Sequence, residues 1–553
     1  MLERRGRSAR MQERREKTSV SAPYVHRRIG IVSLIDDESV AIIERNADRI
    51  LDEIGMDFRG DPETLEIFRA AGARVDGERV RFDPGWCRDK IKTAPKVFTQ
   101  HARNAARSVQ IGGDAQLFCP SFGPPFVHDM EKGRRYATIH DFREITKLHY
   151  SLNAVHHSGG VVVEPVDLAV PIRHLHMAHS HLTLSDKPFM GAVTAPERAR
   201  DTISMAKLAM GEEFVDQNCV LYSVVNTNAP LVMDETMLWA LKEYAKAGQC
   251  TVVSPFVLGG AMSPVSVAAT LAQVLAEVLA CVSLIQLIRP GAPAVFGTFF
   301  SPISLRTGAP TFGTPEGTQF QMCAKTLADR LGLPFHSVGA LTASKVPDAQ
   351  AGYESQSQLM GAVMAGVNFI IHATGCLEGL LTTGYEKIVM DADRCAAMAR
   401  FVQGIDFSEA AQAMDAFAEI GPGGHFLGAA HTRDNFESAF WMGDMSDNGT
   451  YEQWIAEGGM WQQDRATARV KQLLADYEAP AMDIAIRSRS TTSSHGAALK
   501  SLEKRHDPAN QLEPGGYGCT ARPLLCGKPE EVRPLPRPDG VPPWPDAISL
   551  GRE

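Results

Sequence analysis

The 553-residue chain lacks the signals of several protein classes. None of its ten cysteines belongs to a CxxC pair, which argues against a structural zinc site and a thioredoxin-like redox pair. The formal net charge is −9, so a nucleic-acid partner is not expected. The basic stretch at residues 3–28 has no apolar segment behind it, so it does not read as a secretory signal. Cysteines scattered through apolar runs are typical of reduced, buried thiols, and we expect a cytoplasmic protein.

Long hydrophobic runs are scarce, and a single run raises the question of a membrane. Residues 265–288 are almost continuously apolar and about long enough to span a bilayer. Gln273, Glu277 and Gln286 interrupt the run, and Ser263-Pro264 resembles the start of a helix. Strand-like segments flank it on both sides. The pattern therefore predicts a helix buried inside a soluble protein, with no membrane partner.

Short apolar, β-rich segments alternate with helical patterns through the middle of the chain. There are eight such segments, at residues 115–120, 154–163, 188–194, 219–226, 250–256, 294–300, 335–341 and 368–374. Several of the helical patterns begin with a proline and an acidic residue in the first turn. Eight strands alternating with helices predict a closed parallel sheet, a TIM (β/α)8 barrel. An open doubly wound sheet is the alternative, but residues 119–123 do not match its GxGxxG phosphate loop.

The flanking regions have different patterns, so the sequence predicts an α/β fold in five parts. The barrel carries an α+β cap at its N-terminal side and a helical extension at its C-terminal side. The length of the chain allows for a barrel of roughly 250 residues with such additions. We expect a disordered basic segment at 1–30, the cap at 31–112, the barrel at 113–420, the helical extension at 421–487 and an extended or disordered tail at 488–553.

Four histidines in one predicted helix invite comparison with a metal site. On a helix, His174 and His181 share one face, whereas His176 and His179 lie near the opposite face. Four ligands cannot converge from these positions, and no metal is expected.

The carboxyl ends of the predicted strands carry the candidate chemistry, because a barrel keeps its active site there. The turn after the seventh strand, Gly339 to Tyr353, is the densest in polar residues. Aromatic faces hold a quaternary ammonium group, which has positive charge but no proton to donate. The alternative is that the aromatic side chains only cover the core of the barrel. We predict Phe256, Phe299, Phe300 and Tyr353 as cage walls, Asn226 as a further substrate contact, Lys345 as a carboxylate anchor, and Glu354 and Glu378 as polar elements of the site.

Several motifs in order resemble the trimethylamine methyltransferase family of corrinoid-dependent methyltransferases. They are Arg306-Thr-Gly-Ala-Pro310 with Phe312-Gly-Thr-Pro-Glu316, the stretch from Leu341 to Glu354, Gly375-Cys-Leu-Glu-Gly379, and Gly423-Gly-His-Phe-Leu-Gly428 with His431-Thr432. The resemblance runs from about Leu34 to Asp483. It implies a TIM barrel that transfers a methyl group from a methylamine or quaternary amine to the cob(I)alamin of a separate corrinoid protein.

Two departures from the family pattern refine this expectation. Trimethylamine enzymes of the family carry pyrrolysine, expected near Ser344 to Gln350, where this chain has standard residues. It therefore resembles the branch that demethylates quaternary amines such as glycine betaine, proline betaine or carnitine. The chain also lacks the Asp-x-His-x-x-Gly motif of corrinoid-binding modules, so we expect no directly bound cofactor and a cobalamin presented by the partner.

The sequence thus favours methyl transfer from a quaternary amine, glycine betaine first. A quaternary nitrogen leaves as a neutral tertiary amine, so the chemistry needs positioning and desolvation but no general acid. Trimethylamine or a sulfonium compound as donor, and a non-catalytic betaine-binding barrel, are the alternatives. A homo-oligomer is left open.

Overall fold

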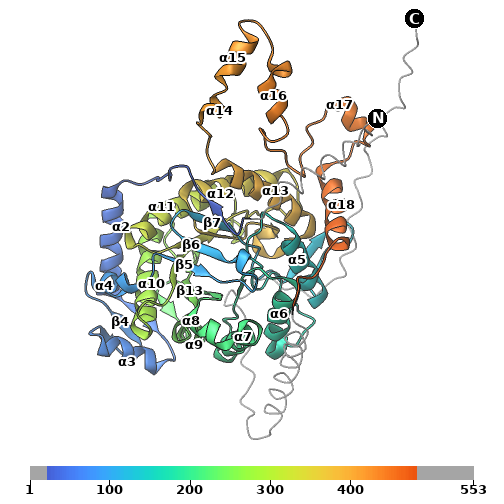
Figure 1. Ribbon diagram of the computed structural model, residues 1–553. Coiled ribbons are helices and arrows are strands. Elements are labelled where there is room, and N and C mark those ends of the chain that lie inside the picture. Colours follow the sequence, from blue (N-terminus) through green and yellow to red (C-terminus); the bar gives the residue numbers. More distant parts are fainter. Residues whose placement is uncertain (1–21, 483–553) are drawn as a thin grey trace, which may run out of the picture. The chain divides into compact units, whose positions relative to one another are not determined.

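An eight-stranded sheet forms the centre of the fold, which a computed structural model describes for residues 22–482 (Figure 1). These residues lie in the first of two units of the chain, Met1–Leu499; the second unit, Lys500–Glu553, lies outside the described residues. Most of the predicted basic segment and of the predicted tail also lies outside them.

Seven of the eight strands run parallel, in an order that follows the chain. Neighbouring strands are β10 (Phe189–Met190), β11 (Leu221–Val225), β13 (Cys250–Val253), β15 (Ala294–Gly297), β17 (Phe335–Val338), β18 (Phe369–Ile371) and β7 (Ala115–Phe118). The eighth, β1 (Val25–His26), pairs antiparallel with β7. The last parallel strand, β18, lies beside the first, β7, which curls the sheet. Seven of the eight segments predicted as strands are thereby confirmed.

The eighth predicted segment, residues 154–163, is not a regular strand, so that prediction is wrong in detail. Gly159 has φ of 86°, a left-handed conformation that interrupts an extended chain. The segment still hydrogen-bonds to both edges of the parallel sheet. The His156 N–H donates to the Phe118 carbonyl in β7 (3.0 Å), and the Met190 N–H in β10 donates to the Gly159 carbonyl (2.9 Å). The His156 Nδ1 also accepts a hydrogen bond from the Phe118 N–H (3.0 Å), a donor that a regular strand would pair with its own backbone.

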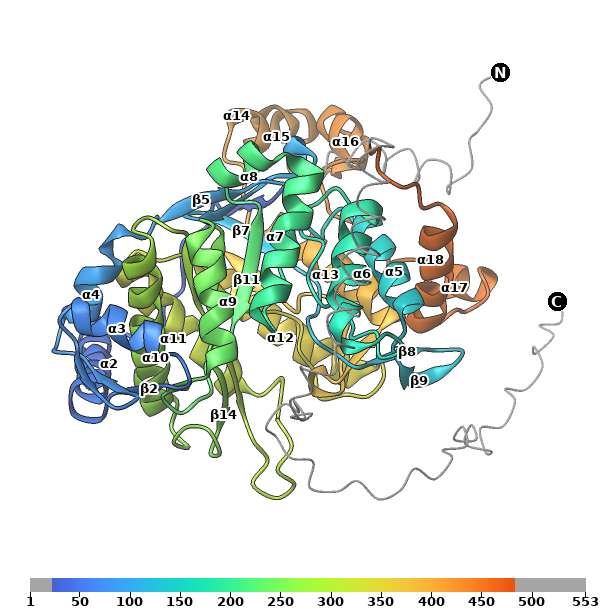
Figure 2. The same cartoon turned by 90° about the horizontal axis from the view of Figure 1, so that it is seen from below.

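Helices follow the strands, as the alternation predicts. They are α5 (Ile139–Ser151), α6 (Val170–Leu184), α7 (Pro196–Met210), α9 (Glu235–Lys246), α10 (Val267–Ile288), α11 (Pro315–Leu331), α12 (Ala349–Ala365) and α13 (Tyr385–Phe401). Both α7 and α11 begin at a proline, which needs no hydrogen-bond partner for its nitrogen there. Figure 2 shows α9 alongside β11, with which it is in contact.

The apolar helix α10 is buried, as the sequence predicts. Among the described residues it alone is long and apolar enough to cross a membrane, and 89% of its most apolar window is buried. It lies against β13 and β15 on one side and against α2 (Asp37–Arg49), α3 (Pro62–Ala70) and α4 (Trp86–Lys90) on another. Because neighbours surround it, apolar residues occur all around the helix. The helix begins three residues later than the Ser263-Pro264 start predicted from the sequence. Its N-cap is Ser266, whose side chain accepts a hydrogen bond from the Ala269 N–H.

The N-terminal region is mixed α and β. A four-stranded sheet joins β2 (Met56–Phe58), β4 (Arg79–Arg81) and β3 (Arg74–Asp76) to β12 (Val232–Met233), which follows β11. A hairpin of β5 (Val97–Gln100) and β6 (Val109–Gly112) directs Phe98, Val109 and Ile111 into the apolar cluster enclosed by the central sheet. The domain boundaries within this continuous core stay a prediction.

Two smaller sheets extend the fold beyond the carboxyl ends of the central strands. Strand β14 (Phe256–Gly259) pairs parallel with β16 (Phe299–Pro302). A second sheet joins β8 (Phe126–Asp129), β9 (Gly133–Tyr136), β19 (Cys376–Leu377) and β20 (Thr382–Gly384). These additions position the loops that carry the candidate site.

The C-terminal region is helical, beginning a little before the predicted boundary. It comprises α14 (Glu409–Gln412), α15 (Met414–Ile420), the 3-10 turn η5 (Phe426–Gly428), α16 (Ala430–Asn435), α17 (Tyr451–Ala456) and α18 (Gln462–Ala475). Helix α18 returns to pack on α13 and α5. Helices α14 to α16 stand out from the rest at the top of Figure 1.

Candidate active site

The turns that follow β17 and β18 are joined by backbone hydrogen bonds. The Glu378 N–H donates to the Ser344 carbonyl (2.6 Å), and the Gly379 N–H donates to the Thr342 carbonyl (2.9 Å). Gly339 lets the two strands meet closely, because a Cβ there would lie 2.9 Å from the Ala373 Cα. The polar turn singled out in the sequence is therefore one half of a two-turn unit at the carboxyl edge of the sheet.

An aromatic cluster lies at the same edge, with Phe299 at its centre. The Phe256 ring stacks on Phe299 with ring centroids 4.6 Å apart. Phe312 and His372 meet Phe299 edge-on, with centroid distances of 5.6 and 5.7 Å. Phe299, Phe312 and His372 are buried, whereas Phe256 is partly exposed. Three of the rings come from different strand ends and Phe312 comes from the loop before α11, so the cluster exists only in the folded sheet.

His372 contributes a polar group to this apolar cluster. Its Nδ1 accepts a hydrogen bond from the Phe122 N–H (3.2 Å), which leaves the ring proton on Nε2. Among residues 22–482, no acceptor pairs with that Nε2. Burial lowers the pKa of His372 to about 3, so the ring is neutral near pH 7. Its backbone φ is 55°, a left-handed conformation uncommon for a residue other than glycine.

Glu354, predicted as a polar site element, is occupied in holding the turn after β17. Its carboxylate accepts hydrogen bonds from the Thr342 Oγ1 (2.5 Å), the Ala343 N–H (2.9 Å) and the Gln350 Nε2 (2.9 Å). Gly313 lies directly against it, since a Cβ there would come within 2.4 Å of the Glu354 Cγ. Glu354 thus joins α12, the turn after β17 and the loop before α11.

Glu378 lies in a turn of unusual backbone geometry beside the cluster. Residues 378, 379 and 380 have φ values of 53°, 61° and 73°. Its carboxylate accepts from the Arg134 Nε (2.6 Å) and the Thr382 Oγ1 (2.7 Å), and the Arg134 guanidinium lies 3.5 Å above the Phe126 ring. A Cβ on Gly379 would lie 3.3 Å from Phe312, so this turn borders the aromatic cluster.

The structure does not bring the other predicted residues into the cluster. Phe300 points to the opposite side of its strand and stacks on Phe320 of α11, with centroids 4.5 Å apart, because successive residues of a strand alternate sides. Tyr353 is 65% exposed on α12. Lys345 is exposed, with its Nζ donating to the Ala343 carbonyl (2.8 Å), and Asn226 is exposed after β11.

Two cluster residues, Phe312 and His372, are absent from the predicted set. Phe312 lies in a loop with no strand pattern, although it opens one of the motifs that carry the family resemblance. His372 directly follows β18, a position that strand-end reasoning could have included. Its contact with Phe299 depends on the left-handed backbone, which the sequence does not signal.

The helical histidines have separate partners. His174 pairs with Asp201 (3.0 Å), whereas His181 contacts the Ser158 hydroxyl (2.7 Å) and the Gly160 carbonyl (2.6 Å). Within residues 22–482, no group of three or more His, Cys, Asp or Glu side chains is arranged to hold a metal ion.

Comparison with known proteins identifies relatives over most of the chain. A glycine betaine methyltransferase of Desulfitobacterium hafniense (strain Y51) is 39% identical over 452 residues, which are 82% of this chain and 94% of that protein. A proline betaine:corrinoid methyltransferase of Eubacterium limosum is 27% identical over 475 residues, covering 83% of this chain and 96% of that protein. The trimethylamine methyltransferase MttB of D. hafniense (strain DSM 10664 / DCB-2) is 26% identical over 448 residues, covering 80% and 89%.

A solved structure and a family model also match most of this chain. The match to the monomethylamine methyltransferase (MtmB) of Methanosarcina barkeri covers 82% of this chain and 97% of that chain at 12% identity, with a TM-score of 0.42. The family model described as trimethylamine methyltransferase (MTTB) matches residues 3–491. The resemblance seen in the motifs is confirmed, and the chain belongs to the trimethylamine methyltransferase (MTTB) family.

Proposed function

We propose that this methyltransferase moves a methyl group from a quaternary amine, glycine betaine first, to the corrinoid of a separate protein. The observation that carries the proposal is the cluster of Phe256, Phe299, Phe312 and His372 at the carboxyl edge of the sheet. The 39% identical glycine betaine methyltransferase supports the choice of donor.

We infer that the central sheet closes into a barrel. Residues 155–160 take the place of the missing strand between β7 and β10, since they hydrogen-bond to both. A closed sheet brings all strand ends to one mouth, where loops from different strands can act on one substrate.

The aromatic rings suit the trimethylammonium end of the donor. Such a cation has no N–H to donate, so aromatic faces and exclusion of water hold it best, with a gain of about 2 kcal/mol at a desolvated site. The carboxylates of Glu354 and Glu378 flank the cluster and supply negative charge nearby. Hydrogen bonds hold both carboxylates in place, so their negative charges attract the cationic substrate from fixed positions.

His372 suits the other end of a betaine. Its neutral ring can donate the Nε2 hydrogen to a substrate carboxylate next to the aromatic faces. Lys345, the anchor predicted from the sequence, is exposed on the adjacent turn and can add attraction from outside the cluster. We assign the primary carboxylate contact to His372 and a secondary one to Lys345.

The corrinoid partner would approach over the same mouth. Six of the segments that follow the strand ends expose large apolar side chains, which we call the rim: Tyr136, Val170, Val265, Leu305, Val346 and Leu381. Exposed apolar side chains of this kind are typical of a binding surface, and a corrinoid offers broad apolar faces to such a surface. The corrinoid supplies the cobalt nucleophile that takes the methyl group. The chain's own residues hold the donor, turn a methyl outward and exclude water.

The test is a methylation assay with reduced corrinoid and a panel of methyl donors. The change in corrinoid absorbance measures methyl transfer. We expect turnover with glycine betaine or a related betaine and none with trimethylamine. Turnover with trimethylamine alone would overturn the choice of a quaternary donor. Tight betaine binding without methyl transfer at any concentration would make the protein a binding barrel.

A further inference from the structure

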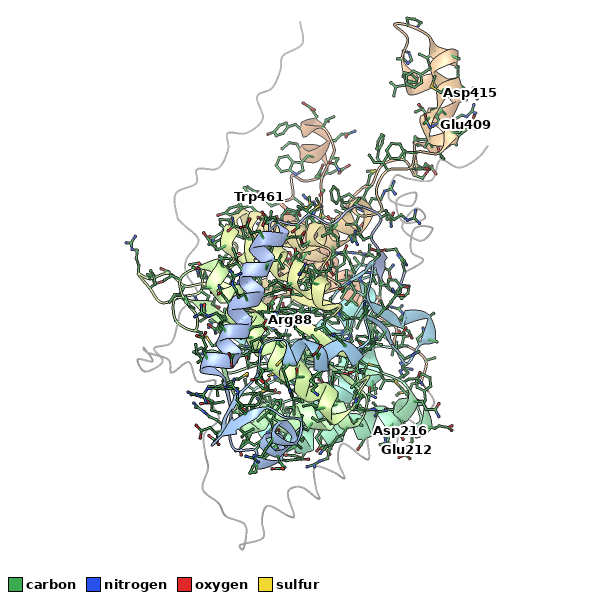
Figure 3. All side chains as sticks on the ribbon, turned by 90° about the vertical axis from the view of Figure 1, so that its left-hand side faces the viewer. Arg88, Glu212, Asp216, Glu409, Asp415 and Trp461 are labelled. Atoms are coloured by element: carbon green, nitrogen blue, oxygen red, sulfur yellow. The ribbon has the colours of Figure 1, made fainter. Side chains whose placement is uncertain are left out.

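Residues 405–440 form an arm that leaves the body after α13 and carries α14, α15, η5 and α16. Figure 3 shows it apart from the core, with Glu409 and Asp415 on its helices. Within the described part of the chain, the side-chain hydrogen bonds of residues 406–438 all end on other residues of the arm, such as the pairing of Glu419 with the Ala430 N–H. The arm is therefore held to the body mainly through its two ends.

The arm exposes an unusual amount of apolar surface. Eight large apolar side chains are between 42% and 87% exposed: Ile405, Phe407, Met414, Phe417, Phe426, Leu427, Phe436 and Phe440. Phe417 and Phe426 touch each other, with centroids 5.4 Å apart, so the arm buries only a small apolar contact of its own. Soluble monomers rarely expose contiguous apolar patches beyond a few hundred Å². A surface of this kind needs a covering.

We propose that a second copy of this chain covers the arm. Taking about 200 Å² for each large side chain, the eight residues expose roughly 1,000 Å² per copy. A stable interface buries about 800 Å² per partner, so the arm alone supplies enough area for a lasting dimer. Two copies can each lay an arm on the other, which makes a closed two-fold assembly.

The composition of the arm argues against the other occupants. Under the proposed function the corrinoid protein meets the rim and does not need the arm, and the more apolar interfaces are the permanent ones. The arm holds six acidic residues (Asp406, Glu409, Asp415, Glu419, Asp434 and Glu437) against the single basic Arg433. Such a charge repels an anionic membrane surface. The acidic groups must lie at the edge of the interface, away from those of the other arm.

The experiment compares charged substitutions on the arm with equally charged substitutions elsewhere. Phe407→Glu, Leu427→Glu and Phe440→Glu change side chains that are at least 76% exposed, so each variant should fold with an unchanged circular dichroism spectrum. Val265→Glu and Leu305→Glu, at 80% and 76% exposed on the rim, are the matched controls. Sedimentation velocity at micromolar concentration measures the assembly state.

We expect the full chain to sediment as a dimer or a multiple of one, and each arm variant to raise the dimer Kd about 30-fold or more, the effect of losing a single important contact. The rim controls should stay assembled. A monomeric wild type, or arm variants that assemble normally, would overturn the proposal. So would assembled arm variants that fail only in methyl transfer to the corrinoid protein, or cosedimentation of the wild type with anionic vesicles.

Discussion

Whether an aromatic residue belongs to the cluster depends on which side of its strand the ring faces. Phe299 and Phe300 are neighbours in β16, yet Phe299 faces Phe256 and His372 whereas Phe300 packs on α11. The sequence predicts both as cage walls because it shows where strands end but not which of two successive side chains faces the mouth. Only one of two adjacent side chains can do so, and the paired strands β14 and β16 decide which.

Replacing Phe299 by leucine tests the cation site. The Phe299→Leu variant keeps an apolar side chain of similar size but loses the aromatic face, so we expect KM for glycine betaine to rise about 10- to 30-fold. The matched Phe300→Leu change, on the other side of the strand, should leave KM within about 2-fold. Steady-state kinetics decides. Equal effects of both changes would remove Phe299 from the site.

Replacing His372 by asparagine tests the carboxylate contact. Asparagine can still accept the Phe122 N–H and tolerates the left-handed backbone, but it lacks the Nε2 hydrogen. Losing a hydrogen bond to a charged group costs about 1.5–3 kcal/mol, so glycine betaine should bind about 10- to 100-fold more weakly. Tetramethylammonium, which has no carboxylate, should bind within about 2-fold of wild type. Calorimetric titration with both ligands separates the outcomes, and equal losses would contradict the assigned contact.

At the scale of elements, a chain of buried polar side chains holds the turns after β17 and β18 in register. The Lys387 Nζ in α13 donates to the Ser355 hydroxyl in α12 (2.9 Å), and that hydroxyl donates to the Ala340 carbonyl after β17 (3.0 Å). Asp391 pairs with Lys387 and accepts the Gly375 N–H after β18 (2.8 Å). Burial raises the pKa of Asp391, so the carboxylate depends on its lysine to stay charged.

Removing Lys387 should therefore be costly. Lys387→Met leaves a buried carboxylate uncompensated and should lower the free energy of unfolding by about 3–5 kcal/mol. Lys387→Met combined with Asp391→Asn should recover part of that loss, because no charge is left unpaired. Urea unfolding measures both. The matched Lys345→Met change removes an exposed lysine and should alter stability by less than about 0.5 kcal/mol.

Helix α10 also uses a buried polar side chain to hold a loop in place. Glu277 is fully buried, accepts hydrogen bonds from the Leu231 N–H and the Gln273 side chain (3.0 Å each), and contacts the Thr227 hydroxyl. It thereby fixes the loop after β11. Gln273 and Glu277, which interrupt the apolar run, therefore have a structural role. From the sequence alone, they only argue against a membrane span.

Acid sensitivity of the whole molecule follows from its neutral buried histidines. Burial lowers the pKa of His149, His156, His336 and His372 to about 3, whereas the unfolded chain protonates histidine near pH 6.5. The unfolded state therefore binds more protons between these values. The stabilising contribution is fully present above about pH 6.5 and is lost as the pH falls toward 3.

The expected loss of stability is steep. Each buried histidine contributes about 1.4 kcal/mol per pH unit well below pH 6.5, so four of them contribute roughly 5 kcal/mol per unit. The carboxyls of Glu277 and Asp391, whose pKa values burial raises, oppose part of this change. Urea midpoints between pH 7 and 5 measure the slope. His149→Gln should reduce it by about one proton, whereas replacing His140, whose side chain is 76% exposed, should not.

The sequence alone determined the alternation of strands and helices, the burial of α10 and membership of the family, because these depend on local hydrophobic period and on long motifs read in order. The tertiary structure decided what depends on contacts between distant residues. Residues 154–163, predicted as a strand, form a segment interrupted by a glycine. Phe312 and His372 lie against Phe299, and Glu354 is engaged in hydrogen bonds that hold the turn after β17. Side-chain direction, left-handed backbone and the meeting of two turns arise only when the sheet brings its strand ends together.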